Sequence, residues 1–231
     1  MKIPGMLVSL QVAALTGFLS TVAKAEDATG VAGSTPATSA AAVLPPATRA
    51  KLLYCKTCHG LSGQGFRADS TMPRLAGQQI EYLKNQVQAF IEHRRKNPIM
   101  YNVAHVLSPE MLDAIVNDFN GLNPKPLAPS LPATSEQIDA GKKLFKDGGT
   151  SASGDIPPCS SCHGDDAKGN GQFPRLAGQP DDYILRKLLN WTKERGQDPA
   201  KPDTSAIMQP IAHELNEQQV RAVAAYLTRL Q

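Results

Sequence analysis

Apolar residues follow a helical period through most of the chain, and no segment shows the strict alternation of a half-buried strand. In the segment 181–195, for example, Ile184, Leu188 and Trp191 fall on one side of a helix. Ser135 is the expected N-cap of one helix, and Pro109 is expected in the first turn of another. The pattern predicts an all-α protein, with a short helical segment at 49–54 and longer helices at 79–96, 108–120, 135–146, 181–195 and 216–230.

Two stretches interrupt this pattern. Residues 26–46 consist largely of Ala, Thr, Ser, Gly and Pro, which cannot bury enough apolar surface to offset the entropy of ordering them. Residues 122–133 are rich in proline, which favours an extended connector. We therefore expect a flexible leader at 26–46, one domain at 47–121, a linker at 122–133 and a second domain at 134–231.

The two expected domains are copies of one another. The hexapeptide Pro-Arg-Leu-Ala-Gly-Gln occurs at 73–78 and again, letter for letter, at 174–179. At the same spacing, Tyr82 corresponds to Tyr183, Phe90 to Trp191 and Arg94 to Arg195. Such agreement indicates duplication of one module.

Each copy holds one Cys-x-x-Cys-His-Gly motif, and the two motifs contain all four cysteines of the chain. This motif is typical of covalent attachment of c-type haem, in which both thiols bind the porphyrin and the histidine binds its iron. Zinc binding and disulfide formation are the alternatives, but neither accounts for the His-Gly continuation of both motifs. The expected cofactors are two covalently attached haem c groups, on Cys55, Cys58, Cys159 and Cys162, with His59 and His163 as axial ligands.

The second axial ligand of each iron is expected to be a methionine. Met100 and Met208 stand at corresponding positions after their histidines, each just ahead of a closing helix. Histidines also recur five residues later, at His105 and His213, and remain competing ligands. Two further methionines lack a methionine in the other copy, which favours a packing role; these are Met72 and Met111.

The amino terminus predicts export. Residues 1–25 combine an early lysine, an apolar stretch and the small-x-small triplet 23–25, as a cleaved secretory signal does. The formal net charge of the whole chain is only +3, which gives no argument for nucleic acid or anionic membrane. No later segment is apolar enough to cross a bilayer, so we expect a soluble periplasmic protein without a transmembrane segment.

Taken together, the paired motifs, the repeated hexapeptide and the late methionines resemble the di-haem cytochrome c4 family, over essentially everything after the leader. The resemblance implies two all-α cytochrome c domains related by pseudo-two-fold symmetry. It also implies that the carbonyls of Pro73 and Pro174 hold the two haem-binding histidines in orientation. Arg74 and Arg175 are then candidates for contact with haem propionates.

Both irons are expected to be six-coordinate, which favours outer-sphere electron transfer between redox proteins and no enzymatic activity. The resemblance implies a quinol-oxidising complex as donor and a terminal oxidase or reductase as acceptor. Two alternatives stay open. One is a di-haem enzyme, either a peroxidase or a sulfur-compound dehydrogenase, and the other is an electron-transfer subunit bound tightly to an oxidase.

Overall fold

The computed structural model describes residues 44–195 and 204–231 of the 231-residue chain. The expected signal at 1–25 and nearly all of the expected leader at 26–46 lie outside the described residues. Within the described part, no helix is long and apolar enough to cross a membrane.

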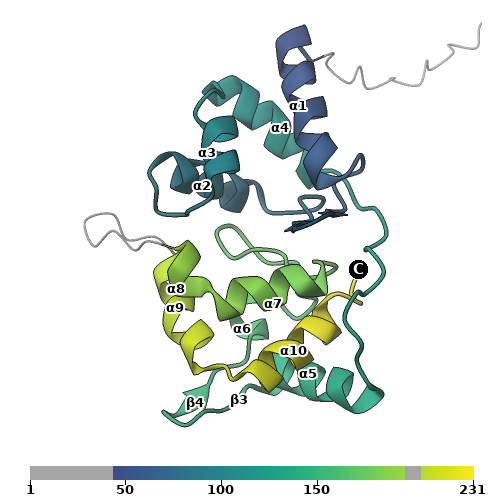
Figure 1. The fold of residues 1–231 in the computed structure, drawn as a ribbon, viewed down its shortest axis with the longest axis vertical. Coiled ribbons are helices and arrows are strands. Elements are labelled where there is room, and N and C mark those ends of the chain that lie inside the picture. Colours follow the sequence, from purple (N-terminus) through teal and green to yellow (C-terminus); the bar gives the residue numbers. More distant parts are fainter. Residues whose placement is uncertain (1–43, 196–203) are drawn as a thin grey trace, which may run out of the picture. The chain divides into compact units, whose positions relative to one another are not determined.

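Module 1, which we define as residues 44–121, is built mainly of helices (Figure 1). Its only strands among the described residues form one short antiparallel pair, in which Phe66 is opposite Met72. The elements are α1 (Pro46–His59), β1 (Phe66–Arg67), β2 (Thr71–Met72), α2 (Ile80–Ile91), α3 (Pro98–Ala104) and α4 (Pro109–Asn120).

Module 2, defined as residues 134–231, has two more helices than module 1 among the described residues: α5 precedes the helix that holds the cysteine motif, and the short α8 follows α7. Helix α5 lies against the closing helix α10 in Figure 1. The elements are α5 (Ser135–Asp147), β3 (Gly149–Thr150), β4 (Asp155–Ile156), α6 (Ser160–His163), α7 (Asp181–Leu189), α8 (Trp191–Glu194), α9 (Ser205–Glu214) and α10 (Glu217–Leu227).

The helix starts follow from local hydrogen bonding. Ser108 caps α4 by accepting from the amide of Met111, with Pro109 in the first turn as expected. Asn216 caps α10 in a capping box with Gln219. Helix α5 begins at Ser135, but its N-cap is Thr134, which forms a capping box with Gln137. The expected cap at Ser135 is therefore wrong by one residue.

Two other local expectations are also wrong. Helix α1 has 14 residues, whereas only a short segment at 49–54 was expected, because Pro46 starts the helix and the cysteine motif continues it. The short strand pairs were missed as well. Strands of two residues, such as Thr71–Met72, are too short to show any alternation.

The correspondence between Arg94 and Arg195 also needs correction. Arg95, not Arg94, matches Arg195: Arg95 lies over the ring of Phe90 and Arg195 over that of Trp191, at 4.8 and 4.7 Å. After α2 the backbone of His93 takes a positive φ of 59°, which places one extra residue in module 1. Constant sequence spacing cannot reveal such a local insertion.

Each module has its own apolar core. In module 1 the core is small, and Phe119 is only 1% exposed. The counterpart of Phe119 in module 2 is Leu227. The backbone carbonyl of each accepts a hydrogen bond from the glycine of a repeated hexapeptide, Gly77 or Gly178 respectively. The larger ring of Phe119 faces Gly63, where an added Cβ would lie 2.8 Å from the ring. The missing side chain of Gly63 thus leaves space for Phe119.

Gly141 permits the close packing of α5 on α10. A Cβ at this position would lie 2.0 Å from the carbonyl oxygen of Ala222, which is part of a helix backbone and cannot turn away. We expect Gly141→Ala to lower the free energy of unfolding of module 2 by about 2–3 kcal/mol, as overpacking does. Urea unfolding followed by circular dichroism measures this. Gly121→Ala is the control, because its Cβ would meet Asn117 at an ordinary 3.6 Å; an equal loss in both variants would contradict the explanation.

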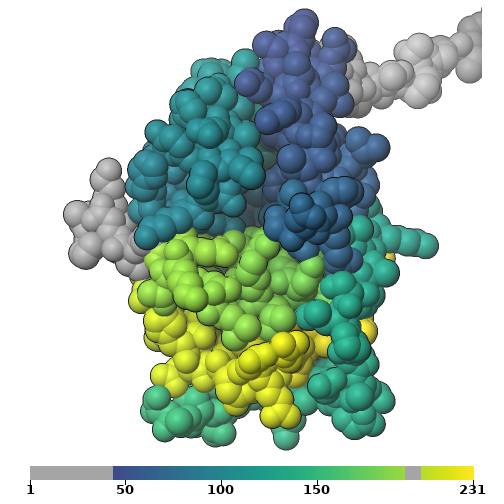
Figure 2. Space-filling view, in the orientation of Figure 1, coloured from purple at the N-terminus to yellow at the C-terminus, as the bar shows by residue number. Residues whose placement is uncertain are grey.

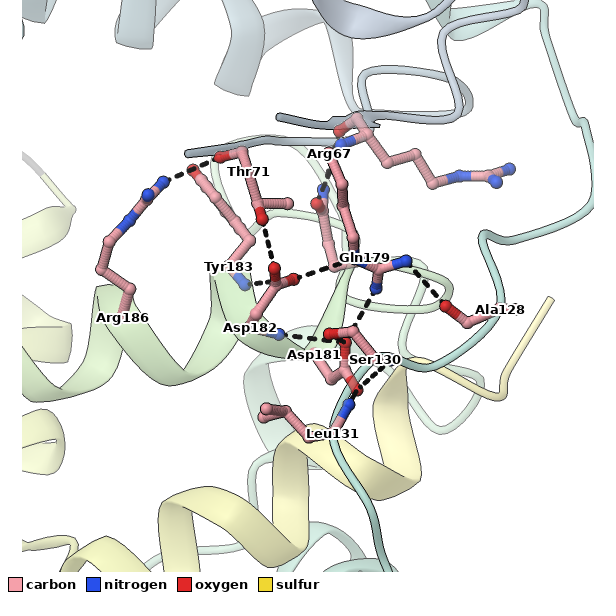
Figure 3. A network of polar contacts seen from close by, with 11 residues as sticks. Arg67, Thr71, Ala128, Ser130, Leu131, Gln179, Asp181, Asp182, Tyr183 and Arg186 are labelled. Carbon is pink, nitrogen blue, oxygen red and sulfur yellow. Dashed lines mark hydrogen bonds and ion pairs between the residues drawn. The ribbon is translucent and has the colours of Figure 1, made fainter. Parts of the chain in front are cut away.

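The connector between the modules is fixed at Asp181, the first residue of α7 (Figure 3). Its carboxylate accepts from the amides of Ser130 and Leu131, at 2.9 and 2.7 Å, and from the guanidinium of Arg67 at 2.8 Å. Arg67 also donates to the carbonyl of Ala128 at 2.7 Å. The extended residues 122–133 are therefore held against both modules.

This anchor predicts a pH dependence of stability. Burial alone would raise the pKa of Asp181, but hydrogen bonds from Leu131 and Ser130 lower it below its ordinary value of 3.8. The contribution of Asp181 is complete above the unfolded pKa and is lost as the pH falls through the lower folded pKa. We expect Asp181→Asn to be less stable than the parent chain near neutral pH, with the difference shrinking as the pH falls below the ordinary carboxyl pKa of 3.8. Urea unfolding at several pH values tests this, with exposed Asp139→Asn as control; a pH-independent difference would contradict it.

Candidate functional site

The two Cys-x-x-Cys-His motifs end helices in the structure. Residues 55–59 form the last turns of α1, and residues 160–163 form α6. In both motifs the following glycine, Gly60 or Gly164, ends the helix with φ of 86° or 77°. A side chain would be strained in that conformation, which explains the glycine after each histidine.

The four cysteines are partly buried, and no disulfide joins them. Burial raises the pKa of Cys55 and raises that of Cys159 to about 11. In the described part of the chain, no group of three or more His, Cys, Asp or Glu side chains lies together in the way that a zinc site requires.

Both motif histidines are buried and held by a backbone carbonyl. His59 Nδ1 lies 3.0 Å from the oxygen of Pro73, and His163 Nδ1 lies 2.9 Å from that of Pro174. Burial lowers the pKa of both imidazoles, so they are neutral. Because a carbonyl can only accept, Nδ1 carries the proton and Nε2 is left with its lone pair. That is the form of imidazole that binds iron.

A largely apolar cavity of about 390 Å³ connects these groups. Figure 2 shows the surface hollowed between the blue residues of α1 and the teal residues of α2, α3 and α4. The cavity is lined by residues of both modules, and Met100 of α3 and Met208 of α9 both face it. The structure thus brings each predicted methionine to the same cavity as the motif histidines.

The competing histidines lie elsewhere. His105 and His213 are both exposed and do not line the cavity. His105 Nδ1 lies 2.9 Å from the carbonyl of Tyr101, and His213 Nε2 lies 2.5 Å from the hydroxyl of Thr192. Of the two other methionines, Met72 lines the cavity and Met111 does not. These placements favour Met100 and Met208 over either histidine.

The arginines of the two repeated hexapeptides, Arg74 and Arg175, differ in how many of their guanidinium N–H groups donate hydrogen bonds to the protein. Arg74 donates to the carbonyls of Ala76 and Pro124, at 3.0 and 2.9 Å, and lies 3.3 Å from Asn123 Oδ1. The buried Nη2 of Arg175, by contrast, has no hydrogen-bond partner among the described residues. The same holds for the buried indole Nε1 of Trp191, and both residues line the cavity. Two unpaired donors in an apolar cavity fit a haem group, whose propionates are acceptors.

Positive charge surrounds the same part of the cavity. Arg95 and Arg195 are each 8% exposed and lie in an antiparallel bridge between the modules. Arg95 donates to the hydroxyl of Tyr183 at 2.8 Å. Burial, followed by the charges of Arg95 and other arginines, lowers the pKa of Lys187 to about 6. This environment favours an anionic group; sequence reasoning missed Arg95, and only its proximity to the repeated aromatic position could have indicated it.

Comparison with known proteins supports a haem-binding site. The family model for cytochrome c matches residues 47–123 and 138–231, which include both motifs. A solved cytochrome c4 structure from Acidithiobacillus ferrooxidans is 32% identical, with a TM-score of 0.57, and the match covers 76% of this chain and 98% of that one.

Other relatives carry names that refer to an enzyme. The thiosulfate dehydrogenase electron acceptor of Stutzerimonas stutzeri is 33% identical over 77% of this chain and 79% of the relative. The solved thiosulfate dehydrogenase (TsdBA) from Marichromatium purpuratum is 30% identical, with a TM-score of 0.58. That match covers 77% of this chain but only 36% of the other, so this chain spans about a third of that protein.

These relatives correct one expectation from the sequence. Two matched irons led us to expect no enzymatic role, but the same tandem modules occur in a protein named as a dehydrogenase. The tandem fold by itself therefore does not separate carriers from components of enzymes.

The duplicated motifs, the helical modules and the matches over both halves show that this chain belongs to the di-haem cytochrome c4 family, with two haem c groups bound covalently through its four cysteines.

Proposed function

We propose that the chain is a periplasmic electron-transfer protein that accepts electrons from a dehydrogenase and passes them to a terminal oxidase or reductase. His59 with Met100, and His163 with Met208, are the proposed axial pairs. One observation carries the proposal. Both histidines, each held by a proline carbonyl, and both methionines line one cavity shared by the modules.

The residues of the chain have simple roles in this function. Bound haem c supplies an iron that takes up or releases one electron at a time. The carbonyls of Pro73 and Pro174 orient the two imidazoles and strengthen them as ligands. The methionine thioethers favour the reduced state and raise the potential. The apolar lining keeps water from the site, which limits the reorganisation that accompanies each electron transfer.

The names of the relatives favour a dehydrogenase as the donor. A relative called a thiosulfate dehydrogenase electron acceptor supports an enzyme that oxidises thiosulfate over the quinol-oxidising complex inferred from the sequence. The predicted signal at 1–25 supports a periplasmic site for this exchange.

Rapid mixing tests the donor. The oxidised holoprotein is mixed with thiosulfate plus a thiosulfate dehydrogenase, and in parallel with a quinol plus a quinol-oxidising complex, while haem reduction is followed by absorbance. Reduction with thiosulfate alone is subtracted. We expect faster reduction in the first mixture; faster reduction by the quinol-oxidising complex would contradict the proposed donor.

Periplasmic extraction, with sequencing of the mature amino terminus, tests the proposed location. Recovery of the protein in the cytoplasm would contradict it.

A second candidate function is that of a subunit held permanently on the dehydrogenase. The similarity to part of a larger thiosulfate dehydrogenase favours it. Size-exclusion chromatography of the complex separates the two candidates. A transient carrier elutes apart from the enzyme at micromolar concentration, whereas a subunit co-elutes with it.

A further inference from the structure

The last glutamine of each repeated hexapeptide reaches into the other module. The side-chain oxygen of Gln179 accepts from the amide of Arg74 at 3.0 Å, and its nitrogen donates to the carbonyl of Arg74 at 2.7 Å. Gln78 makes the same pair of bonds to the backbone of Arg175, at 2.6 and 3.1 Å. Figure 3 shows Gln179 at this boundary. Both glutamines are buried: 3% of the surface of Gln78 and 5% of that of Gln179 is exposed.

The peptide groups that these glutamines contact also hold the haem-binding histidines. The amide of Arg74 belongs to the same peptide as the carbonyl of Pro73, which accepts from His59. In module 2, the amide of Arg175 and the carbonyl of Pro174, which accepts from His163, likewise share one peptide. A continuous chain of hydrogen bonds therefore runs from each histidine, through one peptide, to a glutamine of the other module.

Such chains polarise their members. When the amide of a peptide donates to a strong acceptor, its carbonyl oxygen becomes more negative and accepts more strongly. A stronger acceptor at Nδ1 makes the imidazole a better electron donor to iron, which stabilises the ferric state and lowers the potential. Burial prevents water from replacing the glutamine.

We propose that Gln78 and Gln179 are positioning residues that set haem potentials crosswise. Gln179 of module 2 lowers the potential of the haem in module 1, and Gln78 of module 1 lowers that of the haem in module 2. This inference rests on the proposed electron-transfer function only in assigning each histidine to an iron.

The alternative role for these glutamines is simple attachment of the modules. A neighbouring residue distinguishes the two roles. The side chain of Gln79 also crosses between modules, donating to the carbonyls of Lys168 and Gly169 at 3.0 and 3.2 Å, but it makes no hydrogen bond to either proline–arginine peptide. Gln79→Leu is therefore a matched control that loses inter-module bonds without breaking either chain.

The test is a spectropotentiometric titration of the holoprotein and three variants: Gln78→Leu, Gln179→Leu and Gln79→Leu. Haem-methyl NMR resonances, assigned by their nuclear Overhauser contacts within one module, show which haem each potential belongs to. We expect Gln179→Leu to raise the potential of the haem in module 1 and Gln78→Leu that of the haem in module 2. Gln79→Leu should move neither by a comparable amount.

Three results would overturn the proposal: no shift, a shift in the variant's own module, or equal shifts in all three variants. If a leucine variant fails to fold, the asparagine variant at the same position takes its place, because the shorter amide stays polar but cannot reach both backbone groups of the opposite arginine. The same rise in the potential of the haem in the opposite module is expected, and an unchanged potential would contradict the proposal. Failure of the donor experiments leaves these potentials unaffected, so the two tests are independent.

Discussion

Met208→His is expected to lower the reduction potential of the haem in module 2 by on the order of 0.2 V, within the range of about 0.8 V that axial ligands span. A thioether stabilises ferrous iron, whereas a second imidazole stabilises ferric iron. The potential of the haem in module 1 should change little, since Met208 belongs to module 2. Spectropotentiometric titration measures both potentials.

The corresponding variant Met100→His should lower the other potential by a similar amount. Met72→Leu is the matched control, because Met72 also lines the cavity but has no methionine counterpart in module 2. If Met72→Leu lowered a potential as far as Met100→His, the ligand assignment in module 1 would be wrong. If Met208→His had no effect, the assignment in module 2 would be wrong, and His213 would become the candidate.

Removing the thiols of module 1 is expected to unfold that module. The double variant Cys55→Ala, Cys58→Ala should carry one haem by mass spectrometry and lose nearly all of the stability of module 1. The apolar core of this module is small, so the haem supplies much of its buried apolar surface. Five residues form its buried cluster: Leu52, Leu83, Ile115, Val116 and Phe119.

Module 2 offers the matched comparison. Its buried cluster has eleven residues, and α5 adds a helix that packs closely on α10 through Gly141. We therefore expect Cys159→Ala, Cys162→Ala to keep more of its helical circular dichroism than the variant in module 1. Retention of a full cooperative transition in module 1 without its haem would contradict the role of haem in its core.

Most of the features that could be predicted correctly from the sequence belong to motifs that occur in both modules. The fold class, the helix at 108–120 and the two haem c groups were predicted correctly, because each has a local signal that occurs twice. The helix predicted at 216–230 is present but ends at Leu227. The pairing of Met100 and Met208 with the motif histidines stays a prediction, which their shared cavity supports.

What the sequence could not show lies mainly between the modules. Nothing local marks Gln78 or Gln179 as partners of the opposite hexapeptide, because those contacts exist only once the two copies meet. The inserted residue near His93 hid the match of Arg95 with Arg195. The expectation of no enzymatic role was wrong because similar tandem modules occur in a protein named as a thiosulfate dehydrogenase, and the haem motifs alone do not separate carriers from components of enzymes.

The assignment of one histidine and one methionine to each iron is tested most directly by a redox titration of the holoprotein followed in the far-red region. There, bonding of methionine sulfur to ferric iron gives a charge-transfer band. We predict two high-potential components, each of which gains this band on oxidation. A single titrating haem, or a low-potential component without the band, would contradict a pair of matched His/Met sites.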